Sequence, residues 1–239
     1  GSNISIRTID GGSGPGATEG EGDLDIQMVL GQAPLCSFII YDGGDAGNNA
    51  LLDVLQTEAD ENAADVISES WGWNIDALTA LAAHNIHMQM NAEGITYMAA
   101  SGDFGTQIEP FSYPDYDPEV LLVGGSIAST DLLGNRVSEV AWSLAQGMGG
   151  GGGWSTNPVS FNIRPDYQKG NGVPTDIPFR LVPDVAANAS GPGLSGAYYF
   201  FLNGSLSSDF VGTSFACPVF AGQLGIAEQV LVGTFVLSP

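Results

Sequence analysis

Basic residues are scarce in this sequence of 239 residues, which has five Lys and Arg against 27 Asp and Glu. The five are scattered and form no cluster: Arg7, Arg136, Arg164, Lys169 and Arg180. The formal net charge of −22 at pH 7 makes nucleic acids and anionic membrane surfaces poor partners. Because so many carboxylates repel one another at neutral pH, we expect folding to raise carboxyl pKa values, and stability to rise as the pH falls. The composition therefore predicts a protein that works in acid.

Cysteines are equally rare, with only Cys36 and Cys217. They can pair in an oxidising compartment or remain free thiols, and the sequence leaves both alternatives open. No apolar run reaches the roughly 18 residues of a membrane helix, and no signal peptide is visible. We therefore expect no membrane partner. The hydrophobic fraction of 44% is enough for a core, and we expect one domain over residues 1–239.

Histidine is limited to His84 and His87, three residues apart within a predicted helix. A serine hydrolase usually needs a histidine base. These positions favour packing or surface residues, and no spacing adds a third ligand that would make them a zinc site. A Ser-His-Asp hydrolase that uses one of them is kept as the weakest hypothesis.

Glycine, in contrast, is abundant at 34 residues and separates segments of strand and helix pattern. Strands are predicted at 4–9, 35–41, 66–72, 96–100 and 121–123, and helices at 21–30, 49–64 and 75–93. A hairpin is predicted around Asn203-Gly204. The alternation indicates an α/β fold with a parallel sheet and helices on both faces, whose sites lie at the carboxyl ends of the strands.

Ser214 is the candidate nucleophile. The segment from Gly212 through Pro218 predicts a helix that begins near Ser214, with the proline in its first turn. Backbone N–H groups at a helix start favour negative charge and can stabilise an oxyanion. The alternative is that Ser214 only caps the helix.

Three acidic residues are candidates for proton transfer. Glu21 and Asp25 are one helical turn apart, so their carboxyl groups share a face and one of them is pushed toward its protonated form. Such a pair suits a general base that works in acid. The alternatives are an acidic helix start exposed to solvent, and the pair Glu19 and Asp23 at the same spacing. Asp103 follows the strand at 96–100 and is either a site residue or a turn residue.

Residues 149–153 are five glycines followed by Trp154. Such a run is typical of a linker. It is also consistent with backbone left bare so that a peptide substrate can lie against it. The run alone does not decide between these two interpretations.

Taken in order, these segments resemble the motifs of the sedolisins, the kumamolisin-like serine-carboxyl peptidases. The segments that match lie at 21–26, 68–72, 100–105, 113–125, 139–142, 151–155, 182–188 and 212–218. The set covers nearly the whole chain, and the His-Gly-Thr motif of subtilisins is absent. The resemblance implies a subtilisin-like three-layer fold with a mostly parallel central sheet.

The resemblance also implies roles for individual residues in an acid-active endopeptidase. Ser214 would form the acyl-enzyme and Glu21 would be its general base. Asp25 would hydrogen-bond Glu21 and tune it, and Asp103 would be an oxyanion donor, for which it must be protonated. The residues expected beside the substrate backbone are Trp71, Gly72, Gly151, Gly152 and Gly153.

For the whole protein, the resemblance implies a monomer that is secreted or placed in another acidic compartment, with peptide or protein substrates and a pro-segment. Calcium is expected from the family, but its ligand segment lies beyond Pro239, so no metal or other cofactor is assigned here. We expect N- and C-terminal parts of the family domain to be missing. A catalytically impaired peptide-binding or scaffold protein is the alternative function. Glu69 departs from the family pattern, which has an apolar strand residue at this position. A buried unpaired carboxylate there is costly.

Overall fold

A parallel sheet forms the centre of the protein. The computed structural model describes residues 3–13, 20–44, 48–107, 111–144, 147–191 and 194–236. The parallel strands, in their order across the sheet, are β10 (Val185–Asn188), β6 (Leu121–Thr130), β4 (Thr96–Ala100) and β3 (Val66–Glu69). Strand β7 (Arg136–Ala141) pairs antiparallel with the outer half of β6. The predicted mostly parallel sheet is confirmed.

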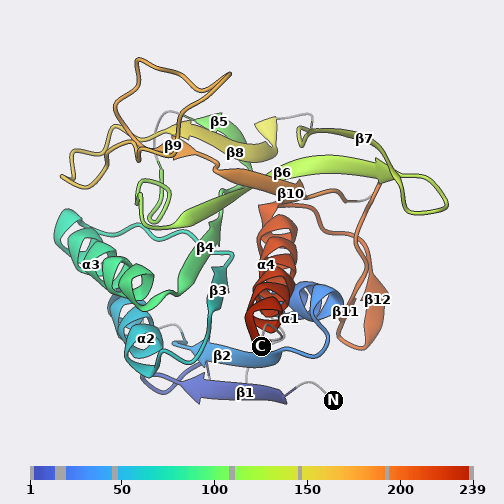
Figure 1. Ribbon diagram of the computed structural model, residues 1–239, viewed down its shortest axis with the longest axis horizontal. Coiled ribbons are helices and arrows are strands. Elements are labelled where there is room, and N and C mark those ends of the chain that lie inside the picture. The colour runs from blue at the N-terminus through green and yellow to red at the C-terminus, as the bar shows by residue number, and fades with distance from the viewer. Residues whose placement is uncertain are drawn as a thin grey trace.

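Helices cover both faces of this sheet (Figure 1). Helices α2 (Asn48–Glu61) and α3 (Ala77–Glu93) lie on one side, and α1 (Gly20–Gln32) and α4 (Thr213–Val236) on the other. Side chains alternate along β3, so that Ile67 joins the core on the α2–α3 side and Val66 the core on the α4 side. The core on the α4 side includes side chains of both α1 and α4. The two helices therefore lie against the same face of the sheet, and their N-terminal ends come together.

Smaller sheets complete the fold. Strands β1 (Asn3–Thr8) and β2 (Ser37–Asp42) pair in parallel, and β11 (Phe200–Leu202) and β12 (Ser205–Ser207) form a hairpin. Asn203 and Gly204 both have positive φ, so the predicted hairpin turn is confirmed. Strand β8 (Gly149–Trp154) lies between β5 (Phe104–Gln107) and β9 (Leu181–Val182). The five glycines are therefore a strand, and the linker interpretation is wrong.

Several element bounds differ from the sequence prediction. Leu35 is 90% exposed and precedes β2 rather than opening it. Strand β3 ends at Glu69, because the chain then turns so that Trp73 can pair with Tyr113. Strand β6 continues to Thr130, because β7 supplies it with a partner that the sequence pattern does not reveal.

Both cysteines are free thiols, which decides between the two alternatives left by the sequence. Cys217 is buried in α4, and its Sγ lies 3.3 Å from the Ser68 Oγ on β3. None of the helices in the described part of the chain is both long and apolar enough to cross a membrane.

Candidate active site

Ser214 is the second residue of α4, so the predicted helix start is confirmed. The preceding Gly212 has a φ of 149°, and a Cβ there would lie 2.6 Å from Asp103 Oδ2. Only glycine fits this approach without strain. Pro218 is the sixth residue of the helix and not part of its first turn, which corrects the prediction. Because proline has no N–H, it leaves the Ser214 carbonyl without its usual helical donor.

Asp103 follows the carboxyl end of β4, and its side chain contacts the first residue of α4, Thr213. Its Oδ1 accepts hydrogen bonds from the backbone N–H of Thr213 at 2.8 Å and from the Thr213 Oγ1 at 2.9 Å. Burial raises the pKa of Asp103, and these two hydrogen bonds oppose the rise without cancelling it. The carboxyl group therefore holds its proton at higher pH than an ordinary aspartate, beside the residue next to Ser214.

Glu21 lies in the first turn of α1 and faces the start of α4. Its carboxyl group lies close enough to the Ser214 hydroxyl for the two to interact. Burial raises the pKa of Glu21, the Ser214 hydroxyl lowers it, and the negative charge of Asp103 raises it again. Oε1 of Glu21 is buried and has no hydrogen-bond partner within the described ranges. The interaction with Ser214 favours the register of Glu21 over that of Glu19, which lies outside the described residues.

Asp25 lies one turn further along α1. Its Oδ1 accepts a hydrogen bond of 2.9 Å from the Ser70 Oγ. The pKa of Asp25 is raised well above its usual value, first by burial and then by the charges of Glu21 and Glu69, while the Ser70 hydrogen bond lowers it. Asp25 is therefore a strongly proton-retaining neighbour of Glu21.

The sequence analysis did not identify Ser70 as a functional candidate, although Ser70 lies inside one of the quoted motifs. The signal was the alternation of β3. Ser68 contacts Cys217 of α4 on one face of the strand, so the side chain two residues later points toward the same face and reaches α1.

The residues expected beside a substrate are only partly explained by the site. Trp71 directly follows Ser70 and is 44% exposed. A Cβ at Gly72 would lie 2.9 Å from the Ser112 Cβ, so packing alone accounts for this glycine. Both residues follow the carboxyl end of β3 and lie outside the strand, whereas the sequence prediction placed them inside it. Their contact with a substrate stays a prediction.

The glycines of β8 also have a packing role. A Cβ at Gly151 would lie 1.7 Å from the Ser101 carbonyl oxygen. The Gly151 N–H donates to the Gly102 carbonyl at 2.7 Å, and the Gly151 carbonyl accepts from the Ser101 Oγ at 3.0 Å. Gly153 is paired with Val182 of β9, and Gly152 with Thr106 of β5. Substrate binding by these three glycines stays a prediction.

The two histidines lie on α3, on the opposite side of the sheet from Ser214 (Figure 1). Both are buried, and their Nδ1 atoms lie 2.8 Å and 3.1 Å from the two carboxylate oxygens of Asp117. The prediction that they are packing residues is confirmed. The alternative of a Ser-His-Asp hydrolase built on them is wrong, because the sheet separates them from the candidate nucleophile.

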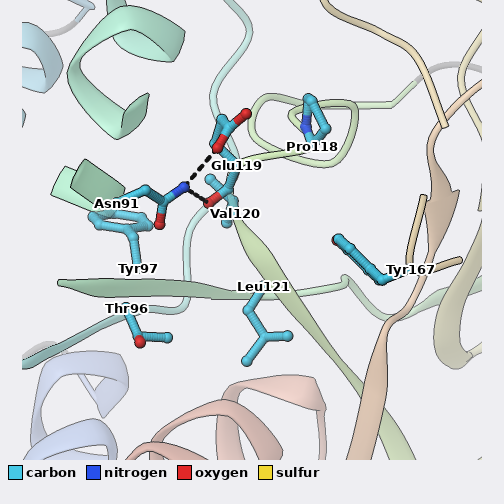
Figure 2. A pocket seen from close by; sticks show the side chains of 8 residues that line it. All are labelled: Asn91, Thr96, Tyr97, Pro118, Glu119, Val120, Leu121 and Tyr167. Carbon is cyan, nitrogen blue, oxygen red and sulfur yellow. Dashed lines mark hydrogen bonds between the residues drawn. The ribbon is translucent and has the colours of Figure 1, made fainter. Parts of the chain in front are cut away.

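Neither a metal site nor a pocket competes with this site in the described part of the chain. No group of three or more His, Cys, Asp and Glu side chains there is placed to hold a metal ion, so no calcium ligand can be named. Figure 2 shows a hollow of about 270 Å³ whose lining includes Thr96 and Leu121. These are the first residues of β4 and β6, so the hollow lies at the opposite end of the strands from Asp103. A side-chain hydrogen bond of 2.7 Å from Asn91 to Glu119 borders it.

Comparisons with known proteins identify relatives of this chain. The model of the subtilase family, Peptidase_S8, matches residues 12–233. Sedolisin of Pseudomonas sp. (strain 101) is 28% identical over 251 residues, which cover 92% of this chain and 41% of that protein. The chain thus spans less than half the length of this curated relative.

Solved structures that are similar to this chain are also peptidases. The structure described as Pseudomonas sedolisin (serine-carboxyl proteinase) complexed with two molecules of pseudo-iodotyrostatin has a TM-score of 0.77 and 27% identity, over 96% of this chain and 68% of that one. The prenylagaramide maturation protease PagA has a TM-score of 0.54 and 19% identity, over 96% of this chain and 70% of that one, and so supports the fold alone. The predicted resemblance to sedolisins and the predicted subtilisin-like fold are confirmed.

Proposed function

This chain belongs to the subtilase family, and from that membership we propose that it is a serine peptidase that hydrolyses peptide bonds in acid, with Ser214 as its nucleophile. The observation that carries the proposal is the approach of the Ser214 hydroxyl to the Glu21 carboxyl group at the start of α4, which lowers the pKa of that carboxyl group. A hydroxyl needs an adjacent base to become a nucleophile. A carboxylate is still such a base at a pH where an imidazole is protonated.

In the proposed reaction, the Ser214 Oγ attacks the carbonyl carbon of the scissile peptide bond while its proton passes to Glu21. The C–N bond then breaks, and Glu21 gives that proton to the leaving amine. An ester between the acyl group and Ser214 results. A water molecule then attacks this ester and gives a proton to Glu21. That proton returns to the Ser214 oxygen when the acid product leaves.

The assignment of Glu21 as base follows from how its surroundings differ from those of Asp25. Burial and the neighbouring carboxyl groups raise the pKa of Asp25 well above its usual value, so Asp25 keeps its proton. The Ser214 hydroxyl stabilises the charged form of Glu21. Of two interacting acids, the one with the lower pKa ionises first and serves as the base.

Asp103 is proposed to donate a hydrogen bond to the oxyanion. Its Oδ1 already accepts two hydrogen bonds from Thr213, which leaves Oδ2 to carry the proton. The raised pKa of Asp103 keeps this proton in place in acid. A carboxylate cannot donate, so activity is lost as the pH rises and Asp103 ionises.

For the protein as a whole we propose peptide or protein substrates, with Trp71, Gly72 and the glycines of β8 beside the substrate backbone. A secreted or otherwise acidic location, a pro-segment and a monomeric state belong to the same proposal. They follow from the relationship to sedolisin and not from a feature of this chain.

The test is hydrolysis of a mixed peptide library at about pH 4, read by mass spectrometry. Ser214→Ala should lower turnover by at least about a thousandfold, because the nucleophile is removed. Ser205→Ala, on the exposed hairpin, is the matched control and should match the wild type. Hydrolysis that survives Ser214→Ala would refute the proposal. Wild-type protein that binds peptides in acid without cleaving them would support the impaired binding protein instead.

A further inference from the structure

Glu69 lies on the face of β3 opposite to the candidate active site. Its neighbour Ser70 holds Asp25, whereas Glu69 points toward α2 and α3 and is 8% exposed. Its Oε2 accepts a hydrogen bond of 3.2 Å from the Trp73 Nε1, and Tyr97 on β4 also hydrogen-bonds with its carboxyl group. A single peptide unit thus separates a buried acid from the residue that positions Asp25.

A second buried acid faces Glu69 from α2. Glu58 is 6% exposed, and the charge of Glu69 acts on it. Oε2 of Glu58 and Oε1 of Glu69 are both buried without a hydrogen-bond partner in the described part of the chain. No basic side chain described in the structure forms an ion pair with either carboxyl group. Each unpartnered oxygen would be costly to bury as a carboxylate.

The other titratable groups around Glu69 offer no compensation. Those that interact with it are Glu58 on α2, Tyr97 on β4, Tyr113 and Asp115 in the segment 111–120, Asp25 on α1 and Cys217 on α4. All of them are neutral or negatively charged. Burial raises the pKa of Glu69 to about 7 and that of Glu58 well above its usual value. Both side chains are therefore protonated in acid.

We propose that Glu58 and Glu69 form a proton-dependent support for the candidate active site. With their protons bound, the two acids pack between β3 and α2, and β3 keeps Ser70 against Asp25. When Glu69 loses its proton, its charge is drawn toward water and the end of β3 moves with it. Ser70 then separates from Asp25. Only this last link rests on the proposed function, in which Asp25 serves Glu21.

The direction of the pH effect follows from linkage. The pKa of Glu69 is about 7 in the folded chain, against an ordinary value of 4.5 for a glutamate, so the folded state binds this proton more tightly than the unfolded state. The contribution of Glu69 to stability is complete below about pH 4.5 and falls as the pH rises to about 7. For Glu69 alone, the unfolding constant should increase by about 300-fold in all, of which roughly 200-fold falls between pH 4 and pH 7.5.

The experiment compares urea unfolding of the wild type with that of Glu69→Gln between about pH 4 and pH 7.5. Glutamine keeps an acceptor for Trp73 but cannot ionise, so the increase in the unfolding constant should be absent. Glu93→Gln removes an equal charge from an exposed position on α3 and should follow the wild type. If Glu69→Gln loses stability with pH as steeply as the wild type, the proposal is overturned.

Two further measurements guard against a variant that fails to fold. Glu58→Gln removes the same repulsion from the α2 side and should also flatten the pH dependence. Neutral-pH stability of the wild type that is abolished by EDTA would identify the pair as a cation site and overturn the proposal. Where hydrolysis is measurable, Glu69→Gln should retain a larger share of its acid kcat/KM at about pH 6 than Glu93→Gln does. Because unfolding needs no turnover, the proposal can stand even if Ser214 proves inactive.

Discussion

Replacing Asp103 by asparagine separates the two roles that a proton has in the proposed site. An asparagine side chain has the shape of a protonated aspartate, and its amide oxygen can take both Thr213 hydrogen bonds. Its NH₂ group then occupies the Oδ2 position against Gly212 and donates a hydrogen bond at every pH. The substitution should keep a hydrogen-bond donor for the oxyanion and remove the ionisation by which Asp103 loses its ability to donate.

The expected size of the effect follows from the charge forms. For every pH unit above the pKa of Asp103, the wild type should lose about tenfold in kcat/KM relative to Asp103→Asn. Asp103→Ala removes the donor altogether and should cost about 3 kcal/mol, or roughly a hundredfold, relative to Asp103→Asn at any pH. In the proposed cycle Asp103 is still neutral at the pH where Glu21 ionises, so its charge does not act on Glu21 there. The acid limb of the profile should therefore stay in place in Asp103→Asn.

The assay is kcat/KM on an internally quenched peptide from about pH 2 to pH 8, with circular dichroism at each pH to show that the chain is folded. Asp103→Asn should be active over a wider pH range than the wild type, with its alkaline limb moved to higher pH. An alkaline limb that stays where it is in Asp103→Asn would refute the assignment of Asp103 as a protonated donor. Asp103→Ala with full activity would refute it as well.

The sequence predicted the elements whose signals are local. Strand β4 has the predicted bounds, and α3 ends at Glu93 with Gly94 in the left-handed conformation that caps it. The start of α4 at Thr213 could likewise be read from a glycine followed by hydroxyl residues. These features depend on a few neighbouring residues, so the pattern contains what is needed to find them.

Features that depend on contacts between distant segments were not predictable in the same way. The glycines of β8 have no side chains whose alternation would mark a strand, and they form one because β5 and β9 supply partners. Glu58 and Glu69 come together only when α2 packs behind β3. The two histidines depend on Asp117, about thirty residues away in sequence, for their hydrogen bonds.

The candidate site lies between these two cases. The pairing of Glu21 with Asp25 is a helical repeat and could be seen in the sequence. Their meeting with Ser214 and Asp103 requires α1 and α4 to lie on one face of the sheet, and this was available only through the family resemblance. Ser70 was missed because its role depends on which face of β3 meets α1.

Two further substitutions test the support of the site against the support of the fold. Ser70→Ala removes the hydrogen bond that holds the Asp25 carboxyl group in place beside Glu21, so kcat should fall about tenfold while the melting temperature changes by only a few degrees. Ser68→Ala, on the same face of β3 but against Cys217, should leave kcat intact, and equal losses in both variants would contradict a positioning role for Ser70. Gly151→Ala places a Cβ against the Ser101 carbonyl oxygen. The backbones of Gly151 and Ser101 are both held by hydrogen bonds, so neither can easily move away. It should destabilise the fold by about 3 kcal/mol in urea unfolding, whereas Gly31→Ala, which meets no atom within 4 Å, should cost nothing. Equal stability of the two alanine variants would mean that β8 yields more easily than its hydrogen bonds to Gly102 and Ser101 indicate.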